Sequence, residues 1–254
     1  MALPALRPRS PSELVDAAFQ ILRAHYPQFV MCSALAYLPW LVVQIVWYSD
    51  PSRLTGISPQ ASVVFGLGIW LVFALMSAVL IVCASQAYLG EPVDVGVAAR
   101  QALPRLPQVL LGAILRYVLM FFGLFFFLFG ALYVLTRFFA VTPILVLEKK
   151  GLGGAFSRSS ELSRNRKRHI FNTIALASLI YWVLAFGLQI AAAILGNLIV
   201  QTLVSAVVTI MVYPVVAITE ALLYFDTRIK SEGLDIELMA GALDGAPPRE
   251  AATP

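Results

Sequence analysis

The chain has 254 residues, of which 60% are hydrophobic and 13% charged, and its mean hydropathy is +0.84. This polar fraction is too small to cover a water-soluble surface, so the composition excludes a soluble globular protein and predicts an all-α polytopic membrane helix bundle. The net charge of +4 comes from basic residues that flank apolar runs. Membrane topology and anionic lipids therefore explain it better than nucleic acid, and we expect no nucleic-acid partner.

Residues 1–27 are predicted to form a cytoplasmic segment with one amphipathic helix, from about residue 11 to residue 26. Ser10, Pro11 and Glu13 match a capping box with proline at the first helical position, which satisfies free backbone N–H groups at a helix start. Apolar residues then recur at helical spacing opposite charged ones. This pattern indicates a helix that lies along the bilayer surface.

Residues 28–232 are predicted to form a membrane domain with six transmembrane helices, because a helix of about 20 apolar residues crosses a hydrocarbon core of roughly 30 Å. The predicted spans are residues 28–49, 62–88, two spans within 109–147, 170–195 and 198–225. Pro39 is expected to kink the first span, and a tight turn near Gly130 is expected to separate the third from the fourth. Residues 233–254 are predicted to be a cytoplasmic tail that is largely disordered at its end.

The polar segments between the spans set the topology. Residues 91–107 and 148–168 are expected to form two more amphipathic surface helices. Of the 18 Lys and Arg residues, 15 fall on the side of the N-terminus, and only Arg53 falls on the opposite side. Basic residues concentrate in cytoplasmic loops, so we expect both termini in the cytoplasm.

Five basic residues crowd beside the membrane after the fourth predicted span: Arg158, Arg164, Arg166, Lys167 and Arg168. Each basic group near an anionic membrane surface contributes about 1 kcal/mol of attraction. We therefore predict that these residues contact anionic lipid, or a protein partner on the cytoplasmic face.

Three ionisable residues lie inside predicted spans: Arg116, Arg137 and Glu220. Facing lipid, such a residue would cost on the order of 2.5 to 3.5 kcal/mol, so all three should face inward. Their depths favour a pair between Arg116 and Glu220, whereas Arg137 would reach backbone carbonyls, Gln189 or Gln44. The pair has two interpretations: an ion pair that fixes helix register, or a polar site for a lipid phosphate or a small anion.

No grouping of residues indicates catalysis, a metal or another cofactor. His25 and His169 are the only histidines, and neither has a cluster of Cys or carboxylate residues at ligand spacing. Cys32 and Cys83 lie in predicted spans, where buried free thiols are expected rather than a disulfide. We therefore expect no cofactor, no metal site and no enzymatic activity.

Three segments together resemble a bacterial membrane-protein family: residues 7–19, residues 143–148 followed by 155–162, and residues 223–235. They look like the membrane domain that in some bacteria precedes a glycerophosphodiester phosphodiesterase domain and in most relatives stands alone, uncharacterised. The resemblance implies a multi-pass protein of the bacterial inner membrane. It implies no activity, because the family's catalytic domain is a separate metal-binding barrel of about 250 residues.

The C-terminal motif of this resemblance includes Tyr224, Asp226, Arg228, Glu232, Gly233 and Asp235. Its aromatic residue suits the head-group layer, its charges alternate at a spacing that permits helical ion pairs, and Gly233 suits a left-handed helix cap. One interpretation is a solvated helix end. The other is a docking surface for a partner or a lipid head group.

Three functions are compatible with these patterns, and we favour the first, a non-catalytic scaffold, docking or accessory subunit of a membrane complex. The second is a small transporter or lipid-handling protein that binds an anionic head group at an inward-facing polar site. The third, a membrane enzyme acting on lipid phosphodiesters, lacks nameable metal ligands and a general base. A polar cavity leading to Arg116 and Arg137 would favour the second function, and a solid apolar bundle would favour the first.

Overall fold

The computed structural model describes residues 9–50, 59–125, 127–194 and 196–232, and every regular element in these ranges is a helix. The all-α bundle that the composition predicts is therefore confirmed. In chain order the α-helices are α1 (Pro11–Ala24), α2 (Tyr26–Tyr48), α3 (Pro59–Tyr88), α4 (Val95–Ala102), α5 (Leu106–Leu124), α6 (Phe127–Arg137), α7 (Val141–Pro143), α8 (Leu152–Leu162), α9 (Lys167–Ile194) and α10 (Leu198–Glu232). A 3-10 turn, η2 (Leu103–Arg105), precedes α5, and a π-helical turn, η3 (Ile144–Glu148), follows α7.

Six helical stretches in the described part of the chain are long and apolar enough to cross a membrane. They are Tyr26–Tyr48, Phe65–Tyr88, Val95–Leu124, Leu128–Glu148, Lys167–Ile194 and Leu198–Glu232. Large apolar side chains such as Phe129 and Ile194 are about four-fifths exposed on their outer faces. Such exposure fits contact with lipid rather than with water.

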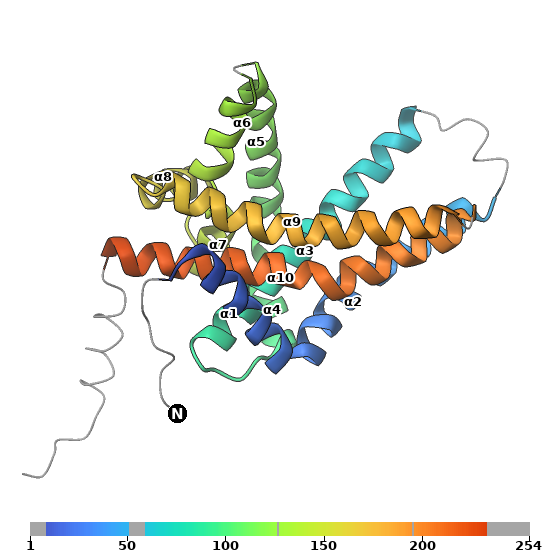
Figure 1. The fold of residues 1–254 in the computed structure, drawn as a ribbon, viewed down its shortest axis with the longest axis horizontal. Coiled ribbons are helices and arrows are strands. Elements are labelled where there is room, and N and C mark those ends of the chain that lie inside the picture. Colours follow the sequence, from blue (N-terminus) through green and yellow to red (C-terminus); the bar gives the residue numbers. More distant parts are fainter. Residues whose placement is uncertain (1–8, 51–58, 126, 195, 233–254) are drawn as a thin grey trace, which may run out of the picture.

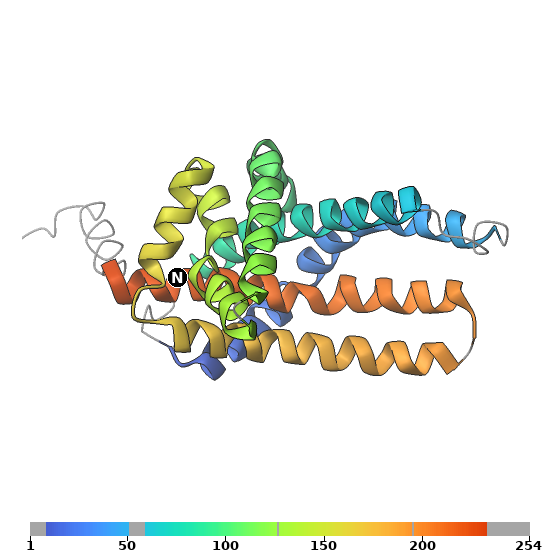
Figure 2. The same ribbon diagram turned by 90° about the horizontal axis from the view of Figure 1, so that it is seen from above.

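The long helices form three antiparallel hairpins, α2–α3, α5–α6 and α9–α10, whose members pack on each other. Helix α10 is the centre of the fold, since it also contacts α1, α2 and α3. Figures 1 and 2 show α9 and α10 side by side, with the α5–α6 hairpin standing crosswise to them. The hairpins diverge from their open ends, at which the two helices of each pair are joined to the rest of the chain. We call this end of the bundle the base, and α1, α4 and α8 lie near it (Figures 1 and 2).

The helix starts at this base follow the sequence signals. The Glu13 N–H donates to Ser10 Oγ over 3.3 Å, and the Ser10 N–H donates to Glu13 Oε2 over 2.7 Å, so the predicted capping box is confirmed. Asp94 caps α4 by accepting from the N–H groups of Gly96 and Val97 over 2.7 and 3.0 Å. The predicted polar turn near Arg53 and the C-terminal tail lie outside the described residues.

The turn between the third and fourth spans does not lie at Gly130, which corrects the prediction. Helix α5 ends at Leu124 and α6 begins at Phe127, so Gly130 lies inside α6, directly against Gly123 of α5. A Cβ atom on Gly130 would overlap the Gly123 carbonyl oxygen. The two glycines therefore allow the backbones of this hairpin to touch, as small residues do between membrane helices.

The fourth span is broken rather than continuous. Helix α6 ends at Arg137, and α7 begins only at Val141. The buried Ser159 of α8 bridges this break, because its Oγ donates to the Arg137 carbonyl and accepts from the Ala140 N–H, both over 3.1 Å. Backbone groups freed by a broken membrane helix must find such partners, and Ser159 supplies them.

Candidate functional site

Two cavities lie where the α5–α6 hairpin diverges from the rest of the bundle. One, of about 240 Å³, lies between α3, α5 and α10, and the other, of about 270 Å³, lies between α5, α6, α9 and α10. Both are lined by Arg116, Tyr117, Tyr213 and Glu220, which we call the polar quartet. The cavities adjoin at the quartet, and we refer to them together as the crevice.

Helix geometry explains why these four side chains meet. Tyr213 and Glu220 lie seven residues apart on α10, or about two turns, so they project from the same face. Arg116 and Tyr117 are neighbours on the facing side of α5. The structure thus brings Arg116 and Glu220 to one site, as their predicted depths suggested.

Arg116 and Glu220 do not form the expected contact pair. Both side chains line the crevice, yet no hydrogen bond or ion pair joins the two among the contacts of the described residues. Glu220 Oε1 is buried without a hydrogen-bond partner there. A buried acceptor left unsatisfied costs about 1 to 3 kcal/mol, so the site holds an unmet demand for a donor.

Aromatic rings form the walls of the crevice. Trp70 of α3 and Tyr117 of α5 pack with ring centroids 4.5 Å apart, and both rings are more than one-third exposed. Deeper in, Phe73 packs edge-on against Tyr213 at 4.9 Å, and the hydroxyl-bearing Thr142 lines the same cavity. The crevice is therefore apolar and aromatic at its edge and polar inside, an arrangement that suits an amphiphile.

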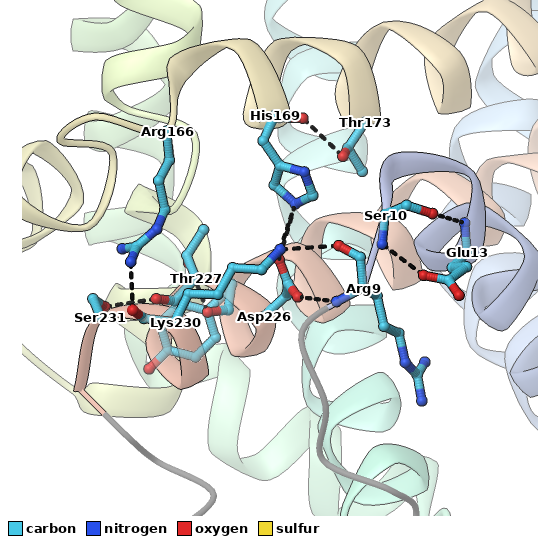
Figure 3. Close-up of polar contacts among 11 residues, drawn as sticks. Arg9, Ser10, Glu13, Arg166, His169, Thr173, Asp226, Thr227, Lys230 and Ser231 are labelled. Atoms are coloured by element: carbon cyan, nitrogen blue, oxygen red, sulfur yellow. Dashed lines mark hydrogen bonds and ion pairs between the residues drawn. The ribbon is translucent and has the colours of Figure 1, made fainter.

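A second polar cluster, which we call the basal latch, joins Arg9, just before α1, to α9 and α10 around Asp226 (Figure 3). The Asp226 carboxylate accepts from the Arg9 N–H at 2.9 Å, from Lys230 Nζ at 2.6 Å and lies 2.9 Å from His169 Nε2. Lys230 Nζ also donates to the Arg9 carbonyl over 2.9 Å. Asp226 is only 2% exposed, so the latch is an internal tie between segments far apart in the sequence.

The rest of the C-terminal motif is also engaged, which corrects the picture of a solvated helix end. The Tyr224 hydroxyl donates to Glu148 Oε1 over 2.9 Å, and Arg228 Nε lies 3.0 Å from Glu232 Oε2. The helical ion pairs that the charge alternation predicted, 226 with 230 and 228 with 232, are both present. Gly233 and Asp235 lie outside the described residues.

The five basic residues of the juxtamembrane block divide into different environments. Arg158 contacts the carboxylates of Glu148 and Glu232, and Arg166 donates to the Lys230 carbonyl. Arg164 and Lys167 instead line a surface pocket of about 200 Å³, and Arg168 lines a more open one beside it. No carboxylate is among the described residues that line either pocket.

Arg137 belongs to this basic pocket and not to a polar interior. Its Nε donates to Ser160 Oγ over 2.9 Å, and its Nη1 donates to the Tyr133 hydroxyl over 2.8 Å. The expected partners are occupied elsewhere, because Gln189 accepts from Ser205 and Gln44 from Tyr37. The assignment failed because α6 ends at Arg137, which places its side chain beside α8.

Several site residues escaped the sequence reasoning. Tyr213 had a detectable signal, since it lies two helical turns before Glu220, and Tyr117 directly follows Arg116. His169 and Arg9 had none, because only the fold brings them to Asp226, 57 and 217 residues away in sequence.

The remaining chemistry of the described residues is sparse. Cys32 and Cys83 are buried free thiols, as predicted. No group of three or more His, Cys, Asp and Glu side chains that could hold a metal ion occurs in the part of the chain that the structure describes. Comparison with protein-family models, with curated proteins and with solved structures finds no match.

Proposed function

We propose that this chain is a lipid-handling membrane protein that binds the polar head group of a membrane phospholipid in the crevice. The observation that carries the proposal is that Glu220 lines two cavities together with Arg116 while one of its carboxylate oxygens is buried without a hydrogen-bond partner among the described residues. The feature expected from the sequence to favour this function was a polar cavity leading to Arg116 and Arg137. The crevice reaches Arg116, whereas Arg137 lies in the separate basic pocket. The proposal involves no catalytic step, and the absence of enzymatic activity remains a prediction.

A purely structural ion pair would explain these residues less well. An ion pair that fixes helix register gains its energy from direct contact between charges and from hydrogen bonds to their remaining atoms. Here the charges line open volume and one carboxylate oxygen has no donor. A bound head group would supply both the donor and the counter-charge.

Arg116 is the type of ligand that a phosphate head group requires. It lies ten residues after the start of α5 at Leu106, so about 15 Å of helix separates it from that end of the hairpin. A guanidinium group binds phosphate oxygens through two parallel hydrogen bonds, and Arg116 is the natural phosphate ligand of the site.

The proposal includes a location that rests on the sequence. The asymmetry of basic residues supports termini in the cytoplasm, and the resemblance to the glycerophosphodiester phosphodiesterase membrane-domain family supports the bacterial inner membrane. Accessibility of tags at the two termini of the protein in intact cells tests the orientation. Termini on opposite sides of the membrane would contradict it.

Retention of lipid through purification tests the function. In mild detergent, the wild-type protein should keep phospholipid that native mass spectrometry detects, and Arg116→Gln should lose it because the phosphate ligand is gone. Arg23→Gln, an exposed arginine on α1, is the matched control and should retain the lipid. Equal retention by all three folded proteins would refute the proposal.

The docking or accessory role is a second candidate, supported by a separate observation. Val97 of α4 and Leu103 of η2 are each 50% exposed at the base of the bundle, where a protein partner could cover them. A photo-crosslinker at residue 97 should then capture one protein reproducibly, while a crosslinker at the exposed Val42 of α2 should not. Capture of lipid alone from residue 97 would contradict this role.

A further inference from the structure

We infer that the crevice selects zwitterionic head groups that carry a phosphate and a protonated primary amine, as phosphoethanolamine does. This inference rests on the proposed function and names the ligand class of the same site. It follows from two requirements that the polar quartet places on an occupant. The occupant must balance the charges of the site, which we call the charge demand, and it must supply a hydrogen-bond donor, which we call the donor demand.

The charge demand comes from the quartet's two opposite charges. Arg116 and Glu220 line both cavities, so an occupant there meets one guanidinium and one carboxyl group, which an ammonium group beside it would hold in the ionised form. A phosphate with an ammonium group leaves the loaded site neutral. A head group with a phosphate alone, such as phosphoglycerol, leaves a net negative charge away from water, and uncompensated buried charge is expensive.

The donor demand comes from Glu220 Oε1, which is buried without a partner among the described residues. Only a group with an N–H or O–H can satisfy it. A primary ammonium carries three N–H donors, whereas the trimethylammonium of phosphocholine carries none. Phosphocholine therefore meets the charge demand but not the donor demand, phosphoglycerol meets the donor demand but not the charge demand, and phosphoethanolamine meets both.

The walls of the crevice are compatible with this occupant. The rings of Phe73, Tyr213 and Trp70 line the cavity that holds Glu220, and aromatic faces attract ammonium groups. The two cavities have the volumes of roughly eight and nine water molecules, which is enough for a head group of this size while the acyl chains stay outside. The exposed edge formed by Trp70 and Tyr117 faces the apolar surroundings in which those chains would lie.

A competition experiment on the full-length protein tests the selection. Wild-type protein in mixed micelles receives equal amounts of phosphatidylethanolamine, phosphatidylcholine and phosphatidylglycerol with identical acyl chains, and native mass spectrometry counts the bound lipids. We expect phosphatidylethanolamine to be enriched about tenfold or more over each of the others, the factor that corresponds to a charge-assisted hydrogen bond. Glu220→Gln should abolish this preference and raise the share of phosphatidylglycerol, because the site then carries only the charge of Arg116.

A second measurement keeps the inference testable if Glu220→Gln does not fold. Wild-type protein is offered phosphatidylethanolamine with one, two or three N-methyl groups, and binding should fall most sharply at the third methyl group, which removes the last N–H. Equal retention of all head groups by the wild type, with loss in Arg116→Gln, would overturn the selectivity and leave the proposed function standing. Absence of any retained phospholipid in the wild type would overturn both.

Discussion

Removal of the Asp226 carboxylate should loosen the base of the bundle more than any other single change to a polar side chain there. The carboxylate accepts hydrogen bonds from the Arg9 backbone and Lys230 Nζ and contacts His169, and it is almost fully buried. In Asp226→Ala all three partners lose the carboxylate at once, and the residues just before α1 lose a hydrogen bond to α10.

The structure sets the size of the effect. Hydrogen bonds to charged groups contribute about 1.5 to 3 kcal/mol each, and removing one partner of a buried pair costs about 3 to 5 kcal/mol. The side chains of Lys230 and His169 are about one-fifth exposed, so water compensates part of their loss. We therefore expect Asp226→Ala to lower the free energy of unfolding by about 3 kcal/mol, and Asp226→Asn, which keeps an acceptor for Arg9, by about 2 kcal/mol.

The two buried thiols provide the assay. Cys32 and Cys83 are 3% and 0% exposed, so a maleimide dye reacts with them only when the protein opens. The midpoint temperature of dye labelling should fall by about 6 to 12 °C in Asp226→Ala, since 1 kcal/mol corresponds to about 2 to 4 °C in a chain of this size. Asp16→Asn, on the exposed face of α1, is the control and should melt with the wild type. If Asp226→Ala also melts with the wild type, the latch does not stabilise the fold and the reasoning fails.

Two further predictions concern the α5–α6 hairpin and the basic pocket. Gly130→Ala should destabilise the protein by about 1 to 3 kcal/mol in the same labelling assay, because its Cβ would overlap the Gly123 carbonyl. The control Gly187→Ala, inside α9, meets open space and should not lower the midpoint, since alanine is the better helix former. Equal midpoints for both variants would show that the hairpin backbones do not touch. The pair Arg164→Gln and Lys167→Gln should weaken binding to anionic liposomes and leave binding to neutral liposomes unchanged, while Arg158→Gln should alter neither, because Glu148 and Glu232 already neutralise Arg158. Unchanged binding of the double variant to anionic liposomes would remove the proposed lipid contact at this pocket.

Local signals in the sequence were enough to predict where most helices begin and end. The Ser10–Pro11–Glu13 pattern marks the start of α1 because the capping atoms lie within one helical turn of each other. The apolar runs likewise predict both ends of α2, α3 and α9 and the start of α10 within three residues, since length and hydropathy alone determine whether a helix can cross a bilayer. Helix α10 continues seven residues past its predicted end at residue 225, into the charged C-terminal motif.

Features that depend on distant segments could not be predicted in this way. The break after Arg137 lies in a continuous apolar run, and its backbone groups are satisfied by Ser159, which is 22 residues further along the chain. The predicted depths of Arg116 and Glu220 in their spans correctly placed the two residues at one site. They could not show that a cavity, rather than a direct contact, lies between the two side chains. That outcome depends on the angle at which α5 and α6 leave the bundle, and no local pattern encodes this angle.

The early end of α6 has a consequence for how far its hairpin reaches. Arg137 lies ten residues from the start of α6, so only about 15 Å of apolar helix projects beyond it. The charges of Arg137, Arg164 and Lys167 are not compensated by carboxylates in the basic pocket, so these side chains should lie at the boundary between membrane and water. With Arg137 at that boundary, the hairpin tip lies near the bilayer midplane, unless the opposite leaflet bends inward to meet it. A hairpin that crosses the bilayer fully and one that inserts halfway differ in the bilayer thickness they require and in the strain they place on the surrounding leaflet. The number of membrane crossings is even for both. In either case, the hairpin returns the chain to the side of the membrane from which it started.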